Sequence, residues 1–212
     1  MVNISVGRQS PEATRRGGQS AVRINTPLRK EDIENLRIGD MVSISGHIVT
    51  GMDRIHKFLF KEKPSVEDIP FNLNGSVLYH CGPIINKTAE GYKLIAGGPS
   101  TSTRLEMYTP WIINEYGIKA IMGKGGMDKK TRDVLAENGG IYLLAISAAV
   151  VIADRIKKVV DGWKIEEFGM PEAMWLLEAE DFPAIVTIDA HGNSLHDEIE
   201  KISLENFKRL LL

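Results

Sequence analysis

Apolar residues recur along residues 22–212 at spacings that predict a series of short strands and helices. Alternation predicts a strand over Met41–Thr50, and short apolar runs predict further strands over 76–79, 92–96, 120–122, 141–145, 163–168, 174–179 and 185–189. Helical spacing or capping residues predict helices over 26–36, 53–60, 101–116, 128–138, 147–157 and 199–212, with a kink or break at Pro110. Strands and helices alternate in the middle of the chain, with strand pairs at both flanks, which favours a mixed α/β sheet.

The chain divides into a tail and a domain. Residues 1–21 are polar and irregular, so we interpret them as a flexible N-terminal tail, although docking onto a partner is an alternative. Residues 22–212 are enough for one domain that buries its own core.

Composition narrows the function classes. Cys81 is the only cysteine, which excludes an internal disulfide, an all-cysteine metal site and a complete iron–sulfur site, because the last needs about three or four thiolates. The net charge of -2 and the lack of a basic, aromatic-rich stripe argue against nucleic-acid binding. The chain shows neither a signal-peptide pattern nor a membrane-spanning apolar run, so we expect a cytoplasmic protein with no membrane partner.

The segment Gly97–Arg104 reads Gly-Gly-Pro-Ser-Thr-Ser-Thr-Arg and joins a predicted strand to a predicted helix. Its glycines let the backbone approach a ligand, and the first amides of a helix favour an anion. The hydroxyl groups and Arg104 add donors, and arginine binds a carboxylate through two parallel hydrogen bonds. A capped helix start with a surface arginine is the simpler alternative.

A second segment, Gly123–Gly126, also lies between a strand and a helix and carries Lys124. It lacks the spacing and the hydroxyl residue of a P-loop, so nucleotide binding is disfavoured. A lysine between glycines at the carboxyl end of a strand still suits anion binding, with an ordinary tight connection as the alternative.

The histidines and the cysteine indicate a site less specifically than the two candidate anion-binding segments do. In Gly46–His56 a strand turns into a helix that Asp53 can cap, which leaves Arg54 and His56 facing either a cleft or solvent. Cys81 follows His80, but burial is a more common role for such a cysteine than nucleophilic attack. His191 and His196 are five residues apart, which favours a turn over a metal pair.

Five segments together resemble, in the same order, motifs of the class I fumarase β subunit family, which the L-tartrate dehydratase β subunit shares. They are Gly46–His56, Tyr79–Pro83, Gly98–Arg104, Gly123–Gly126 and Gly169–Ala173. The resemblance implies a single swivelling β/β/α domain. It also implies a [4Fe–4S] cluster held by a separate α subunit, in a heterotetramer of two α and two β subunits.

The resemblance assigns roles to particular positions. Ser100 is implied to be catalytic, with an activating neighbour from the α subunit. The substrate-binding residues implied are Arg104, Lys124, Thr101, Arg54 and His56, and no metal ligand is expected in this chain. The family commonly has an arginine where this sequence has Met52, which leaves the substrate open.

The expected function is the β subunit of a two-component hydro-lyase that converts fumarate to L-malate reversibly. L-tartrate dehydratase and mesaconate hydratase β subunits are alternatives within the family. A non-catalytic anion-binding or assembly module is the alternative from another class, and Met52 favours it.

Overall fold

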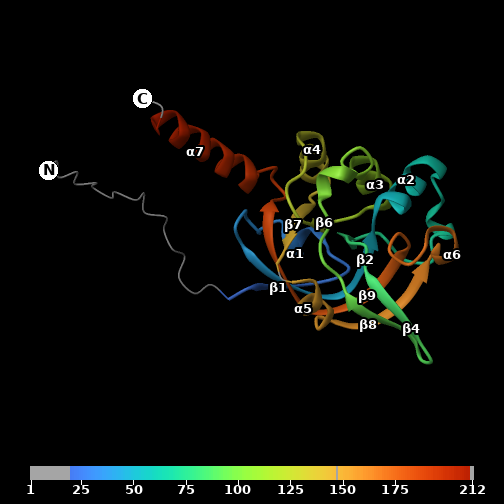
Figure 1. Ribbon diagram of the computed structural model, residues 1–212. Coiled ribbons are helices and arrows are strands. Elements are labelled where there is room, and N and C mark those ends of the chain that lie inside the picture. Colours follow the sequence, from blue (N-terminus) through green and yellow to red (C-terminus); the bar gives the residue numbers. More distant parts are fainter. Residues whose placement is uncertain (1–19, 147, 211–212) are drawn as a thin grey trace.

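The computed structural model describes residues 20–146 and 148–210, so most of the predicted N-terminal tail lies outside the described residues (Figure 1). The strands are β1 Val22–Asn25, β2 Met41–Gly51, β3 Val77–His80, β4 Ile84–Thr88, β5 Gly91–Ala96, β6 Ala120–Gly123, β7 Ile141–Ala145, β8 Ile156–Trp163 and β9 Met174–Ile188. The helices are α1 Lys30–Ile33, α2 Asp53–Glu62, α3 Thr109–Tyr116, α4 Lys129–Glu137, α5 Ala149–Ala153, α6 Ile165–Phe168 and α7 Leu195–Leu210, with 3-10 turns η1 Val66–Asp68 and η2 Ser102–Leu105.

The main sheet closes on itself. Strands β1, β2, β3, β6 and β7 are parallel neighbours in that order, and β9 runs antiparallel to β7. The other edge of β9 pairs with β2, with Ile48 opposite Leu177, so β2, β3, β6, β7 and β9 form a ring. Strand β8 extends β9 outside this ring. The prediction of a mixed α/β sheet with flanking helices is therefore confirmed.

Two apolar cores follow from the alternation of side chains along the ring strands. Val77 and Tyr79 of β3 point to the first core, where the Tyr79 ring meets Phe182 of β9 at 5.5 Å. Leu78 points the other way, into a second core shared with α2, α3 and α4, which cover one side of the sheet (Figure 1). Both faces of β3, β6 and β7 are thus largely buried.

The parallel strands β2, β3 and β6 end at one edge of the sheet. Gly51 at the end of β2 is in register with His80 at the end of β3, and Tyr79 is in register with Met122 of β6. The loops that follow these strands therefore lie side by side, and ligands commonly bind at this edge of α/β sheets.

Two predicted elements are wrong. The predicted helix 26–36 is reduced to α1, because the amides of Thr26 and Leu28 donate to the carbonyls of Ser45 in β2 and of Gly75 in the turn before β3, and not to carbonyls within a helix. The predicted strand 163–168 is a helical turn, since β8 ends at Trp163 and Lys164 adopts a left-handed φ of 64°.

Other boundaries moved. The two predicted strands 174–179 and 185–189 are parts of β9, and β4 was not predicted. The break expected near Pro110 is confirmed, because η2 ends at Leu105 and α3 begins at Thr109. The 147–157 helix is limited to α5 within the described residues, with β8 starting at Ile156.

We expect Ile48→Ala to lower the free energy of unfolding by about 2–5 kcal/mol, because it leaves a cavity inside the closed ring. Ile48 is fully buried, whereas Ile84 on the β4–β5 hairpin is 59% exposed. The control Ile84→Ala should therefore change stability by less than about 0.5 kcal/mol. Urea denaturation compares the two variants, and equal losses would contradict the assignment of Ile48 to the ring core.

Candidate functional site

The loops that carry Ser100 and Lys124 are joined through their backbones. The Lys124 amide donates to the Ser100 carbonyl at 3.1 Å, and the Ser102 amide donates to the Lys124 carbonyl at 3.1 Å. Thr101 and Lys124 form an isolated parallel bridge, so the segment after β5 adds to the end of β6. The Ser100 amide also donates to the His80 carbonyl at 2.8 Å. These bonds fix Ser100, Thr101 and Lys124 at the carboxyl edge of the sheet.

Arg104 lies on the neighbouring turn η2 and brings a third loop to the same edge. Its guanidinium forms an ion pair with Asp53, the first residue of α2. The side chains of Arg104 and Asp53 are 56% and 38% exposed, so the pair remains accessible to a ligand. Lys124 is also exposed, and Ser100 and Thr101 are partly exposed. A small anion can reach a serine, a threonine and two cationic side chains here.

Arg54 is directed elsewhere. Its guanidinium donates to the Phe168 carbonyl at 3.2 Å and lies 5.7 Å from the centre of the Phe168 ring. Its backbone amide donates to the Glu172 carboxylate at 2.8 Å. The structure therefore places Arg54 against α6 and the segment that follows it, and does not bring its side chain together with Arg104. Met52 is buried, with Gly82 beside it.

His56 belongs to a buried polar cluster beneath the edge. Its Nδ1 lies 2.9 Å from the Met52 carbonyl, and its ring meets His80 edge to face at 5.0 Å. His80 Nδ1 lies 2.9 Å from the Ser102 hydroxyl, to which the Tyr142 hydroxyl donates at 2.8 Å. Both histidines are fully buried, so in this chain His56 supports the loops from below.

Two glycines make room for this cluster. A side chain at Gly51 would meet the His56 ring at 2.8 Å, and one at Gly123 would meet the Ser102 hydroxyl at 2.2 Å. His80 ends β3, and Gly51 at the end of the neighbouring strand β2 is in register with it. Gly123 ends β6, which is the neighbour of β3 on the opposite edge. Two glycines beside one histidine thus let His56 and Ser102 contact it.

The protonation states of the cluster follow from burial. Removal from water lowers the pKa of His56 to about 4, against smaller opposing effects of the Met52 carbonyl and Asp53. Burial and the neighbouring His56 hold the pKa of His80 well below its usual range. Because a carbonyl only accepts, neutral His56 carries its proton on Nδ1. Both Nε2 atoms are buried without a hydrogen-bond partner among the described residues.

Sequence reasoning missed His80, Ser102 and Tyr142 as members of one cluster. Ser102 lay in a noted run of hydroxyl residues and His80 beside the single cysteine, so a weak signal existed for both. Tyr142 gave none, because its contact with Ser102 joins residues 40 positions apart. Cys81 is buried as expected, and burial raises the pKa of its thiol to about 12.

The residues of this chain do not suit an iron–sulfur cluster. One cysteine with a protonated, buried thiol cannot supply the usual set of thiolates. Across residues 20–146 and 148–210, no three His, Cys, Asp or Glu side chains are grouped as metal ligands would be. The same residues contain no helix that is long and apolar enough to span a membrane.

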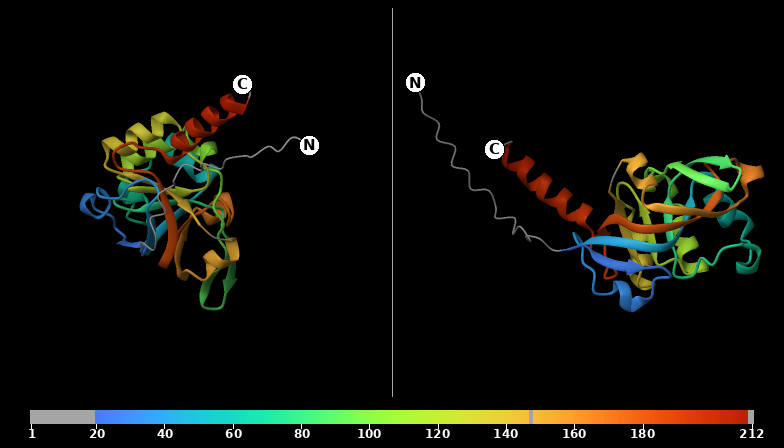
Figure 2. Two further views of the ribbon diagram at one scale, coloured as in Figure 1. Left: turned by 90° about the vertical axis from the view of Figure 1, so that its left-hand side faces the viewer. Right: turned by 90° about the horizontal axis from the view of Figure 1, so that it is seen from below.

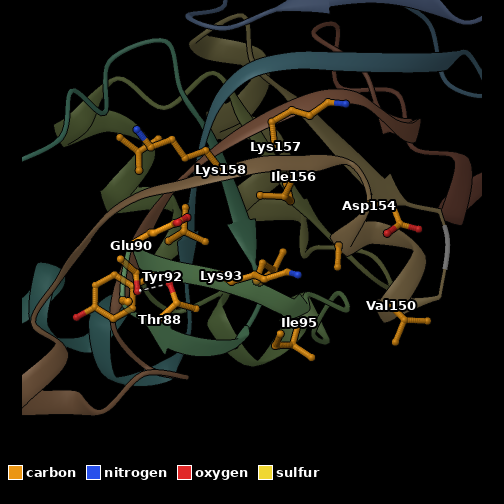
Figure 3. A pocket seen from close by; sticks show the side chains of 16 residues that line it. Thr88, Glu90, Tyr92, Lys93, Ile95, Val150, Asp154, Ile156, Lys157 and Lys158 are labelled. Atoms are coloured by element: carbon orange, nitrogen blue, oxygen red, sulfur yellow. Dashed lines mark hydrogen bonds between the residues drawn. The ribbon is translucent and has the colours of Figure 1, made fainter.

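The structure also has a groove of about 1040 Å³, which Figure 3 shows. Residues of the β4–β5 hairpin, α5 and β8 line it, and they include Lys93, Lys157, Lys158 and Asp154. None of Ser100, Arg104 and Lys124 is among its lining residues. Its size alone does not make it the functional site, because it contains none of the residues that the motifs single out.

We expect the chain to lose stability between pH 6.5 and pH 4. In this window unfolded His56 binds a proton that folded His56 does not, so stability is complete above about pH 6.5 and falls with pH. The expected contribution of His56 is about 1.4 kcal/mol per pH unit, and His80 adds in the same direction.

Urea denaturation at several pH values measures this slope. His56→Gln should reduce it by about one proton, and His47→Gln, at an exposed position of β2, is the control for the replacement of a histidine. An equal slope in the wild type and in His56→Gln would show that His56 is not held neutral.

Comparison with known proteins identifies relatives of two kinds. A Geobacillus stearothermophilus protein provisionally named a class I fumarate hydratase is 48% identical over 190 residues, which are 89% of this chain and 36% of that protein. This chain thus spans about a third of that relative.

The second kind covers nearly the same length as this chain. A Methanocaldococcus jannaschii protein, provisionally named an L(+)-tartrate dehydratase subunit beta, is 38% identical over 87% of this chain and 95% of its own length. The L(+)-tartrate dehydratase subunit beta of Escherichia coli K12 is 33% identical over 86% of this chain and 90% of its own length.

The family model described as Fumarase C-terminus matches residues 4–199. This match includes the ring and both loops that carry Ser100 and Lys124. The chain therefore belongs to the Fumarase C-terminus family, and its relatives are named as a class I fumarate hydratase and as beta subunits of L(+)-tartrate dehydratase.

Proposed function

We propose that this chain is the β subunit of a two-component hydro-lyase that adds water to fumarate, giving L-malate, and catalyses the reverse reaction. The observation that carries the proposal is the arrangement at one edge of the sheet. Ser100 and Lys124 share backbone hydrogen bonds there, and Arg104 follows on the next turn, with its side chain accessible.

Arg104 and Lys124 bind the carboxylates of the substrate. Removal of the proton from the carbon next to a carboxylate places negative charge on that carboxylate, and fixed cations stabilise the charge as it develops. Asp53 pairs with Arg104 in the free chain and so orients the guanidinium before the substrate arrives. Thr101 adds a hydroxyl donor beside Lys124.

Ser100 is proposed to be next to the reacting carbon. The loop hydrogen bonds hold its backbone, and its side chain is partly exposed at the edge. A serine hydroxyl is a weak base unless a neighbouring group activates it. Because the buried His56 and His80 lie below the loops, the activating group is assigned to the partner chain.

The [4Fe–4S] cluster is likewise assigned to a cluster-bearing α subunit, because this chain cannot hold it. A cluster held by that subunit would supply a Lewis acid. The relatives named as a subunit beta support an enzyme made of two separate chains. This chain matches only 36% of the class I relative, which agrees with a fusion of the counterparts of the two chains in that protein. We propose two copies of each chain in the assembly.

Tartrate and mesaconate are the alternative substrates. The similarity to two tartrate dehydratase β subunits favours tartrate, and the higher identity to the class I relative favours fumarate. Met52 lies where the family commonly has an arginine, and the structure does not direct Arg54 into that place. This chain therefore offers the substrate one cationic side chain fewer than the family pattern, which has an arginine at the position of Met52.

Met52 in place of an arginine also favours a second candidate function, a non-catalytic anion-binding or assembly module. A hydratase assay of the chain assembled with its cluster-bearing partner, over a panel of fumarate, L-malate, L-tartrate and mesaconate, separates the candidates. Turnover of fumarate above the others supports the leading proposal. Assembly without turnover of any of the four would support the module.

We expect Arg104→Ala to lower kcat/KM of the assembled enzyme by an amount equivalent to about 2–5 kcal/mol, the range for losing one partner of a desolvated charge pair. Arg29→Ala is the matched control, because Arg29 forms a surface ion pair with Asp32 far along the chain from these loops. Steady-state kinetics give the comparison, and a loss of less than about threefold for Arg104→Ala would count against its role.

We also expect the isolated chain to purify colourless and without hydratase activity. Its single buried cysteine cannot hold a cluster, and the proposed reaction needs the partner. Absorption spectra and an assay before and after addition of the cluster-bearing chain test this. A brown chain with cysteine-bound iron would contradict it.

A further inference from the structure

Helix α7 leaves the body of the protein, and none of the residues that the structure describes covers its outer part. Every described residue from 197 to 210 is exposed, and three views show the helix projecting away from the sheet and its covering helices (Figures 1 and 2). A 16-residue helix has little stability in water without tertiary packing. The family match ends at residue 199, so most of α7 lies beyond the part shared with the family.

One side of α7 is an apolar stripe. At 100° per residue, Ile199, Ile202, Phe207 and Leu210 fall within about 140° of the circumference, together with residues 195, 196, 203 and 206. This stripe contains no Asp, Glu, Lys or Arg. Each of the four named side chains is more than half exposed. A stripe of this width is typical of a helix that packs against a partner.

Charges divide α7 into unlike halves. The first half carries three acidic residues and one basic residue, Asp197, Glu198, Glu200 and Lys201, whereas the second half carries one acidic and two basic residues, Glu205, Lys208 and Arg209. Two copies packed antiparallel place each acidic half beside a basic end, whereas parallel packing places like charges together. The polar side has four acidic and three basic residues, so it lacks the cationic excess that favours an anionic lipid surface.

The base of α7 is held firmly. Asp197 forms an ion pair with Arg132 of α4, and its amide donates to the Ser194 hydroxyl at 3.3 Å. His196 packs against Gly126, where an added side chain would meet its ring at 3.1 Å. Contacts with α4 and with the loop that carries Lys124 therefore fix the direction in which α7 leaves the domain.

We infer that α7 is a homodimerisation element: two copies of this chain pair through their α7 stripes, antiparallel about a twofold axis near Ile202 and Ser203. The helix is roughly 24 Å long, so two such helices bury less area than a standard interface. The dimer is accordingly concentration-dependent. This inference is independent of the proposed reaction, since it concerns residues outside the loops of the site.

Sedimentation velocity of the full chain over a range of concentrations tests the inference, using two charge-reversed variants. One combines Glu198→Lys with Glu200→Lys, and the other combines Lys208→Glu with Arg209→Glu. Each should weaken self-association at least tenfold, because every substituted residue then faces like charges at the opposite end of the second helix. An equal mixture of the two should restore the dimer, since their charges are complementary in the antiparallel arrangement.

Cysteine cross-linking fixes the orientation independently. Cys81 is buried, so an introduced cysteine on α7 is the accessible thiol. Ser203→Cys should cross-link to itself near the twofold axis, whereas Leu210→Cys, about 22 Å from its symmetry mate, should not. Circular dichroism of each variant verifies that the helix content is retained.

A wild-type chain that remains monomeric up to high concentration would overturn the inference, even if α7 were then found to bind the cluster-bearing subunit. A mixture of the two variants that stays monomeric, or preferential cross-linking through Leu210→Cys, would also overturn it. None of these outcomes depends on hydratase activity. A result against α7 dimerisation can therefore be told apart from a result against the proposed reaction.

Discussion

The common register of β2, β3 and β6 is the constraint on which the site depends. Because these strands are parallel, their carboxyl ends bring together segments that are far apart in the sequence. His80 occupies the middle position at this edge, and the glycines on either side admit His56 and Ser102. The loops that carry Ser100 and Lys124 rest on this buried layer and hold each other through backbone hydrogen bonds. The exposed side chains of Arg104 and Lys124 are thus positioned by a layer of buried side chains, which includes His56, His80 and Ser102.

Features that depend on near neighbours in the chain could be predicted from the sequence. A capping residue is one of the signals for the predicted helix 128–138, and the Asp128 carboxylate indeed caps α4 by accepting the Thr131 amide at 2.9 Å. The helix expected from Thr26 starts only at Lys30, because the amides of Thr26 and Leu28 bond to distant carbonyls of Ser45 and Gly75, which no local pattern reveals. Strand β4 was missed because Ile84–Thr88 has few apolar residues and pairs with β5 in a small separate sheet. Long-range pairing decided both cases.

The same division applies to the site. The motifs predicted that Ser100, Thr101, Arg104 and Lys124 lie at strand ends, and the structure brings these four residues to one edge. Their roles toward a substrate remain predictions. His56 and Arg54 were assigned to the same surface, but burial takes the first below the loops and contacts with Phe168 take the second to α6. No spacing rule shows which way a side chain turns when the deciding neighbour is more than a hundred positions away.

Closure of the ring by β9 has a consequence for biosynthesis. Strand β2 ends at Gly51 and β9 begins at Met174, so about 120 residues must be made between them. At ordinary rates of translation this takes roughly 6 to 25 seconds. During that time the edge of β2 that β9 will cover presents unpaired backbone groups, which other strands can bind. The nascent chain is therefore most in need of chaperone protection just before its last strand emerges from the ribosome.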